Sequence, residues 1–143
     1  CKYLGVAGFV RLKFFVSTAQ TSIDIFAHHG KGASRLIGGS LNRVQQLAEV
    51  AHADIYLMGH DHKRSTGVQS RMYLDKLCTV KEQRQLFART GSFLKAYKDG
   101  KVSYIADMAL PASDLGAITI HMTPRRDRAK DGRGLWVQLE ASI

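Results

Sequence analysis

Two short apolar segments of this chain each run directly into histidine. Residues 21–27 read T-S-I-D-I-F-A and lead into H-H-G at 28–30, while residues 54–58 read D-I-Y-L-M and lead into G-H-D-H at 59–62. Short apolar runs of this kind are typical of buried strands. Apolar side chains at helical spacing over residues 41–51 predict one helix between them. Two strands joined by a single helix are most simply neighbours in a parallel sheet, so the sequence predicts an α/β fold.

Parallel pairing of these strands would bring the two histidine segments together. The carboxyl ends of parallel strands lie side by side, and open α/β sheets bind their ligands at that edge. We therefore expect His28, His60 and His62 to converge, although they are far apart in the sequence. Neutral imidazole nitrogens suit divalent Mn, Fe, Zn or Ni. Gly59 is expected to allow a close backbone approach, or a conformation that a side chain would forbid.

The remaining segments predict mostly strands. Residues 9–16 alternate with period two, as in a strand with one apolar face. Ser40 is placed to cap the helix that follows it, and Asp99 with Gly100 is a hairpin turn signal. Further strands are expected at residues 68–78, 84–90, 117–122 and 135–139. The run K-E-Q-R-Q-L-F, which overlaps the second of these, is also compatible with a helical turn.

The composition restricts the kind of protein. A hydrophobic fraction of 45% in 143 residues is enough for one domain spanning residues 1–143, and no apolar run is long enough to predict a membrane span. The net charge of +9 favours anionic partners such as phosphate esters or nucleic acid, or serves only solubility. Cys1 and Cys78 have no partner at metal-ligand spacing, which predicts free thiols in a reducing, cytoplasmic setting.

Three segments, taken in order, resemble a known family. They read D-I-F-A-H-H-G, then L-N-R-V-Q-Q-L-A, then A-D-I-Y-L-M-G-H-D-H. A lone histidine after a strand, followed by G-H-x-H, is similar to the last two motifs of the calcineurin-like metallophosphoesterases. The later A-R-T-G-S-F-L at residues 88–94 resembles the strand-to-loop segment that often follows them. The resemblance covers about residues 21–122, which is the greater part of the chain.

The resemblance implies a fold, a reaction and a set of ligands. The chain would form the C-terminal half of an αββα sandwich, strand-rich with one main crossover helix, and the intact site would hold two divalent ions. A metal-bridging hydroxide would attack the phosphorus of a phosphomonoester or phosphodiester. By position, His28 and His60 would bind one ion and His62 the other. His29 would orient a ligand or contact phosphate, although its assignment in place of His28 stays open.

Other charged side chains lie close to the two histidine motifs in the sequence. Lys31, Lys63 and Arg64 are placed to attract a substrate phosphate, or they are only solvated. Asp61 is expected to be a solvated loop residue, rather than one that holds a water near the phosphate.

Charged groups elsewhere are expected at the surface. His52 and His121 are predicted to be exposed. A basic hairpin tip is predicted either to be a solvated turn or to contact nucleic acid. Its basic residues are Arg125, Arg126, Arg128, Lys130 and Arg133.

The chain departs from the family pattern in three motifs. D-x-H, G-D-x-x-D and G-N-H-[DE], which would supply a bridging carboxylate, an Asn ligand and a proton donor, do not occur. We therefore expect one metal ion or none, and weak activity or none, from this chain alone. Because it begins at Cys1 rather than Met, we expect the C-terminal portion of a longer protein. The alternative is a truncated, non-catalytic metal-binding or nucleic-acid-binding module that forms a homodimer through an exposed sheet.

Overall fold

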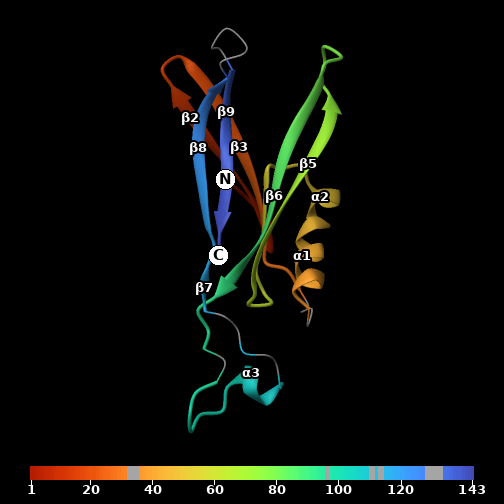
Figure 1. Cartoon of the computed structure of the whole chain (residues 1–143). Helices are drawn as coiled ribbons and strands as arrows, with labels where there is room; N and C mark the ends of the chain where they lie inside the picture. The colour runs from red at the N-terminus through yellow and green to blue at the C-terminus, as the bar shows by residue number, and fades with distance from the viewer. Residues whose placement is uncertain (32–35, 96, 110–111, 113–114, 128–133) are drawn as a thin grey trace.

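The computed structural model is an α/β protein in which strands predominate (Figure 1). It describes residues 1–31, 36–95, 97–109, 112, 115–127 and 134–143. Within these ranges the strands are β1 (Lys2–Tyr3), β2 (Ala7–Val16), β3 (Ala19–His28), β4 (Ile55–Met58), β5 (Arg64–Leu74), β6 (Val80–Ser92), β7 (Gly116–Ala117), β8 (Thr119–Asp127) and β9 (Gly134–Ser142). The helices there are α1 (Ile37–Gln45), α2 (Leu47–Val50) and α3 (Tyr104–Asp107). The predicted α/β class is confirmed.

β3 and β4 are parallel neighbours, and the connection between them contains α1 and α2. Their register pairs Ile25 with Ile55 and His28 with Met58. β4 also pairs in parallel with β6, where Met58 lies opposite Arg89. Among the described strands the sheet order is β1-β2-β3-β4-β6-β5, with β7 paired to β6. The predicted strand–helix–strand crossover is confirmed, and His28, Met58 and Arg89 share one level across three parallel strands.

Two long antiparallel hairpins extend this central sheet on both sides. β2 pairs with β3, and β5 pairs with β6. Figure 1 shows the two hairpins diverging toward their turns. The strands expected at residues 9–16, 68–78 and 84–90 overlap β2, β5 and β6. The alternative helical turn for K-E-Q-R-Q-L-F is wrong, because this run lies in β6 and is paired along its whole length with β5.

The predicted cap at Ser40 is wrong, because α1 begins before it. Leu36 is the N-cap residue and makes no side-chain capping bond. The backbone N–H of Ser40 already donates to the carbonyl of Leu36 at 3.1 Å, as inside a helix. Gly38 and Gly39 occupy the first turn, and glycine has low helix propensity. The sequence signal for this turn is therefore weak, and Ser40 is instead a fully buried helical residue.

Alternating side chains of the central sheet form two cores. Tyr56, Met58 and Phe87 face α1 and α2, where they pack with Val44 and Leu47. Figure 1 shows α1 and α2 on one side of the central sheet and the β8–β9 hairpin on the other. The core beneath that hairpin contains Ile23, Ile55, Leu86, Ala88 and Leu139. A helical layer, a central sheet and a second sheet are therefore stacked through two separate apolar interfaces.

The segment after β6 differs in part from the sequence-based expectation. Gly100 has φ 69° in the turn with Asp99, and one bridge joins Lys98 to Lys101. The chain then enters α3 instead of a hairpin strand. The physical reason is a local cap, since the hydroxyl of Ser103 accepts the N–H of Ala106 at 3.2 Å.

The second sheet extends into the predicted charged tip. β8 and β9 pair from Thr119 opposite Ser142 to Asp127 opposite Gly134. The strands expected at residues 117–122 and 135–139 are therefore confirmed in substance. Arg125 and Arg126 belong to β8, while Arg128, Lys130 and Arg133 lie outside the described residues.

Two general expectations concern the surface. No helix in the described ranges is long and apolar enough to cross a membrane. Cys1 and Cys78 are exposed and free of disulfide bonds, in agreement with the expectation of free thiols.

Candidate metal centre

The imidazoles of His29 and His60 are in contact at the carboxyl edge of β3 and β4. Nδ1 of His60 lies 3.3 Å from Nε2 of His29. The ring centroids are 5.3 Å apart and the rings are nearly perpendicular, at 82°. Both residues are exposed to solvent. Parallel pairing of β3 with β4 therefore brings one histidine from each motif together at the edge where the sequence predicted a site.

His28 is held by a local hydrogen bond. The backbone N–H of Gly30 donates to its Nδ1 at 2.7 Å. In a neutral ring the proton then resides on Nε2, so neither nitrogen has a free lone pair. Gly30 adopts φ +85°, and a Cβ there would lie 2.8 Å from Cγ of Met58. The glycine is needed for this turn, and His28 can bind a metal only if it gives up the bond to Gly30.

His62 is partly buried and lies two residues beyond His60 in the same turn. Within the described part of the chain, no three or more His, Cys, Asp or Glu side chains gather closely enough to hold one metal ion. The contact between His29 and His60 is thus the pair that the geometry brings together. The roles of His28 and His62 as ligands stay predictions.

The unusual backbone of the turn falls on the histidines and not on Gly59. His60 has φ 76° and His62 has φ 57°, both in the left-handed region. Gly59 lies outside that region, and a Cβ there would make an ordinary 3.5 Å contact with the carbonyl of His29. A left-handed conformation costs a residue with a side chain about 1–3 kcal/mol. The surrounding structure must therefore hold this turn in place.

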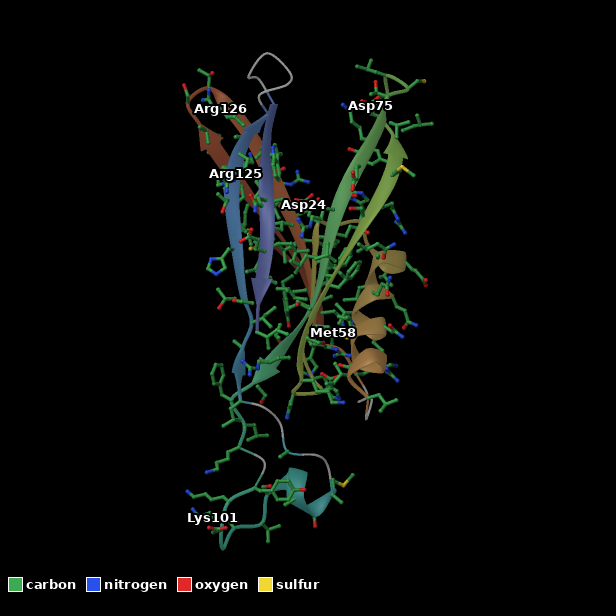
Figure 2. The ribbon with its side chains drawn as sticks, viewed as in Figure 1. Asp24, Met58, Asp75, Lys101, Arg125 and Arg126 are labelled. Atoms are coloured by element: carbon green, nitrogen blue, oxygen red, sulfur yellow. The ribbon has the colours of Figure 1, made fainter. Side chains whose placement is uncertain are left out.

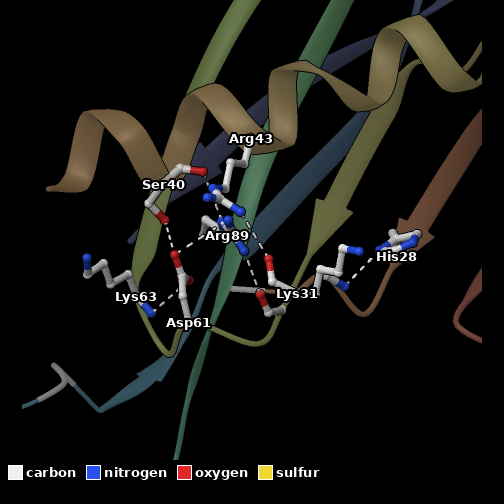
Figure 3. Close-up of polar contacts among 9 residues, drawn as sticks. His28, Lys31, Ser40, Arg43, Asp61, Lys63 and Arg89 are labelled. Atoms are coloured by element: carbon white, nitrogen blue, oxygen red, sulfur yellow. Dashed lines mark hydrogen bonds and ion pairs between the residues drawn. The ribbon is translucent and has the colours of Figure 1, made fainter. Parts of the chain in front are cut away.

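The expectation that Asp61 is solvated is wrong. Its side chain is only 1% exposed and lies 3.5 Å from Nη2 of Arg89. It also accepts a hydrogen bond from the hydroxyl of Ser40. A carboxylate is buried only where charge and hydrogen bonds compensate the loss of water. Asp61 points into the protein beneath α1, where it pairs with Arg89 (Figure 3).

Arg89, which the sequence-based reasoning did not single out, is the partner of Asp61. Its side chain is fully buried. Its Nη1 donates to the carbonyl of Gly59 at 2.6 Å and its Nε to the carbonyl of Ser40 at 3.0 Å (Figure 3). Burial lowers the pKa of the guanidinium from its ordinary value, and the charge of Asp61 acts in the opposite direction. An arginine inside the apolar run L-F-A-R-T of β6 was the sequence signal for it.

The predicted phosphate-proximal residues lie around this turn. Lys31 is exposed, and its carbonyl accepts a hydrogen bond from Nη1 of Arg43 at 3.1 Å. The N–H of Lys63 faces Oδ1 of Asp61 at 3.5 Å. The stem of Arg64 lies over Gly91, where a Cβ would approach its Cγ to 2.6 Å.

Two further histidines lie apart from the turn. His52 and His121 are exposed, as expected. His52 lines a shallow pocket beside Arg11 and Asp24. It therefore offers a histidine of the same chemistry outside the candidate centre.

The nitrogen geometry fits one metal ion better than two. Two imidazoles on one tetrahedral ion, with metal–nitrogen distances of about 2.0–2.1 Å, have nitrogens about 3.3 Å apart. The separation between His29 and His60 is 3.3 Å. A second ion next to the first would need a bridging carboxylate, and Asp61 already pairs with Arg89. The residues fit a single ion held by His29 and His60.

Comparison with known proteins adds no relative. No protein-family model, curated protein or solved structure matches this chain. The functional assignment must therefore come from the geometry and chemistry of the site.

Proposed function

We propose that this chain is part of a metal-dependent phosphoesterase of the calcineurin-like kind, in which His29 and His60 hold a divalent ion. The observation that carries the proposal is the 3.3 Å contact between these two imidazoles at the carboxyl edge of parallel strands. The contact joins the first histidine motif to the G-H-D-H motif. Because the two residues follow the ends of separate strands, β3 and β4, a random surface pair is a weaker explanation than a site built by the crossover.

The layering of the fold supports the same proposal. Helices α1 and α2 cover one face of the central sheet, and the β8–β9 hairpin covers the other (Figure 1). A helical layer on a sheet that packs against a second sheet is the arrangement expected for half of an αββα sandwich. The connection between β3 and β4 contains α1, and one helix between the two histidine strands is also part of the resemblance, which supports the proposal.

The proposed chemistry divides between the ion and the side chains. A bound divalent ion supplies Lewis acidity toward a phosphate oxygen. His29 and His60 would offer Nε2 and Nδ1 to it, each ring keeping its proton on the other nitrogen. The cationic side chains that follow the turn, Lys63 and Arg64, would favour an anionic ester over a neutral one. The net charge of +9 agrees with an anionic substrate.

The same geometry explains why turnover by this chain alone should be weak or absent. The carboxylate next to His60 in the sequence is that of Asp61, which is buried and paired with Arg89. A two-metal phosphoesterase needs an anionic bridge between its ions. We therefore expect about one bound ion, and efficient hydrolysis only where further carboxylate ligands are supplied.

Metal binding and hydrolysis by single-histidine variants test this proposal. His29→Ala and His60→Ala should each weaken Zn²⁺ or Mn²⁺ binding by at least the ~10–100-fold that loss of a supporting partner costs. His52→Ala is the matched control, because it removes an exposed histidine outside the centre. Equilibrium dialysis with metal analysis gives affinity and stoichiometry. The proposal fails if the purified chain binds no ion, or if His52→Ala and His60→Ala weaken binding equally.

Activity on an aryl phosphodiester with added Mn²⁺ separates enzyme from module. Any hydrolysis should disappear in the variant that combines His60→Ala with His62→Ala, and persist in His52→Ala. Metal binding without hydrolysis agrees with the weak or absent turnover expected of this chain alone, whereas hydrolysis that survives the double substitution contradicts a role for this turn.

A second candidate, a self-associating module, rests on the edge strand β5. In the described part of the sheet β5 pairs only with β6, so its outer backbone edge is unpaired. Met72, Leu74 and Leu77 are exposed along this hairpin. The tip of this hairpin, at Asp75, lies far from Met58 (Figure 2). Met58 is the residue that lies next to the histidine turn.

Light scattering tests this second candidate. We expect a dimer at high protein concentration, and a monomer when Met72→Lys places a charge on the exposed strand. A wild-type chain that stays monomeric at high concentration contradicts it, without bearing on the metal site.

A further inference from the structure

A buried guanidinium lies directly beneath the turn that carries His60 and His62. We infer that Arg89, together with Asp61 and Ser40, is a positioning device that holds His60 against His29. Arg89 touches no expected ligand position itself. It acts through the backbone and carboxylate of the turn, so it is a positioning residue and not a catalytic one.

Arg89 contacts the turn directly. Nη1 of Arg89 donates to the carbonyl of Gly59 at 2.6 Å, and that carbonyl also accepts the N–H of Asp61 at 3.1 Å. Nη2 of Arg89 lies 3.5 Å from the carboxylate of Asp61. The guanidinium thus fixes the residues on both sides of His60.

Arg89 and Asp61 both contact Ser40 of the crossover helix α1. Nε of Arg89 donates to the backbone carbonyl of Ser40 at 3.0 Å. The hydroxyl of Ser40 donates in turn to Asp61. Figure 3 shows these contacts joining α1, β6 and the turn. One closed network therefore ties the G-H-D-H turn to the helix that connects the two histidine strands.

The network holds a turn that contains two left-handed residues. Asp61 stands between His60 at φ 76° and His62 at φ 57°. Such conformations persist at residues with side chains only when their surroundings over-determine them. Ser40 and Arg89 both contact Oδ2 of Asp61, so Asp61 is the residue through which the surroundings act. Without these contacts to Asp61, the turn is expected to relax, and His60 would no longer face His29.

Stability alone is a poor explanation for this network. Buried ion pairs are often no more stable than apolar residues of the same volume. Nη2 of Arg89 is buried and makes no hydrogen bond within the described structure, although it faces Asp61. A buried donor in this state calls for an explanation, and a role beyond packing is one. Positioning of the metal-binding turn is such a role.

Nuclear magnetic resonance of the metal-free protein tests the inference directly. The wild type should give a nuclear Overhauser contact between ring protons of His29 and His60. Arg89→Met should abolish this contact, and Ser40→Ala should weaken it. Arg89→Lys, which keeps the charge but not the three-sided contact, should fall between wild type and Arg89→Met.

The matched control is Gln85→Leu, on the same strand. Gln85 is as buried as Arg89 but bonds to the hydroxyl of Tyr56 at 3.1 Å, away from the turn. Its replacement removes a buried polar network and should leave the ring contact intact. Metal affinity gives a second readout that rests on the proposed function. It should fall about 10–100-fold in Arg89→Met and stay unchanged in Gln85→Leu.

The outcomes separate the inference from the proposed function. A ring contact that survives Arg89→Met, or is lost equally in Gln85→Leu, overturns the positioning role. If Arg89→Met does not fold, Arg89→Lys and Ser40→Ala decide the matter by the same contact. A wild type that binds no metal ends the proposed function alone, and the ring contact still judges the inference.

Discussion

Asp61→Ala is expected to lower the free energy of unfolding by about 3–5 kcal/mol, because it leaves a buried charge without its partner. The side chains of Asp61 and Arg89 are 1% and 0% exposed. Removing the carboxylate leaves the guanidinium buried without an anionic partner, in a site from which water is excluded. It also removes the acceptor for the hydroxyl of Ser40. Urea unfolding followed by circular dichroism measures the loss as a lower midpoint at an unchanged slope.

A double substitution separates the effect of the ion pair from the effect of the volume that its side chains fill. Asp61→Leu combined with Arg89→Met replaces both charges by apolar groups, and should recover most of the stability that Asp61→Ala loses. Asp107→Ala, at an exposed aspartate, is the matched control and should change stability by no more than about 0.5 kcal/mol. If Asp61→Ala unfolds at the wild-type midpoint, the carboxylate is not buried against Arg89 in solution.

Leu139→Ala is expected to cost about 2–5 kcal/mol, because it opens a cavity between the two sheets. Leu139 is 2% exposed and belongs to β9. It packs with Ile23, Ile55 and Leu86 of the central sheet. The β8–β9 hairpin touches the rest of the fold mainly through this apolar layer, so the substitution should loosen its attachment. Chemical denaturation measures the loss, and hydrogen exchange should show faster exchange along β8 and β9.

The control uses the same substitution at an exposed site. Leu74 is 68% exposed on β5, and Leu74→Ala should change the free energy of unfolding by no more than about 0.5 kcal/mol. Equal effects at the two positions contradict the packing of β9 on the central sheet. They would also weaken the sandwich on which the proposed family assignment partly rests.

Much of the central sheet follows from local sequence pattern. The runs that end at His28 and at Met58 are short and apolar, and the helix between them has one apolar face. These three signals are each local, and together they leave parallel pairing as the simplest arrangement. The observed register of His28 opposite Met58 agrees with it. The alternation of β2 likewise reports its pairing with β3, because period two is a property of the strand itself.

The burial of the charged side chains Asp61 and Arg89 could not be predicted from local sequence pattern. An aspartate between two histidines in a glycine-containing turn has every local mark of a solvated residue. Its burial depends on Arg89, which comes from a strand far along the chain. Ser40 was mistaken for a cap for the same reason, since its hydroxyl serves Asp61 instead of the helix end. Partners distant in sequence decide the direction of such side chains.

Local sequence pattern also could not decide whether His28 or His29 contacts His60. Successive side chains alternate in direction while the chain stays in a strand. β3 ends at His28, so the direction of His29 is set by the turn at Gly30 and not by the strand. The contact of His29 with His60 therefore depends on the backbone geometry of the turn, which the two-residue alternation of a strand does not predict.

X-ray absorption at the zinc edge tests most directly whether these imidazoles share an ion. With one equivalent of Zn²⁺, the wild type should show at least two imidazole nitrogens at about 2.0–2.1 Å. His60→Ala should lose one of them, while His52→Ala should give the wild-type spectrum. A zinc shell made only of oxygen, or one that is unchanged in His60→Ala, would contradict a metal centre at the edge of β3 and β4.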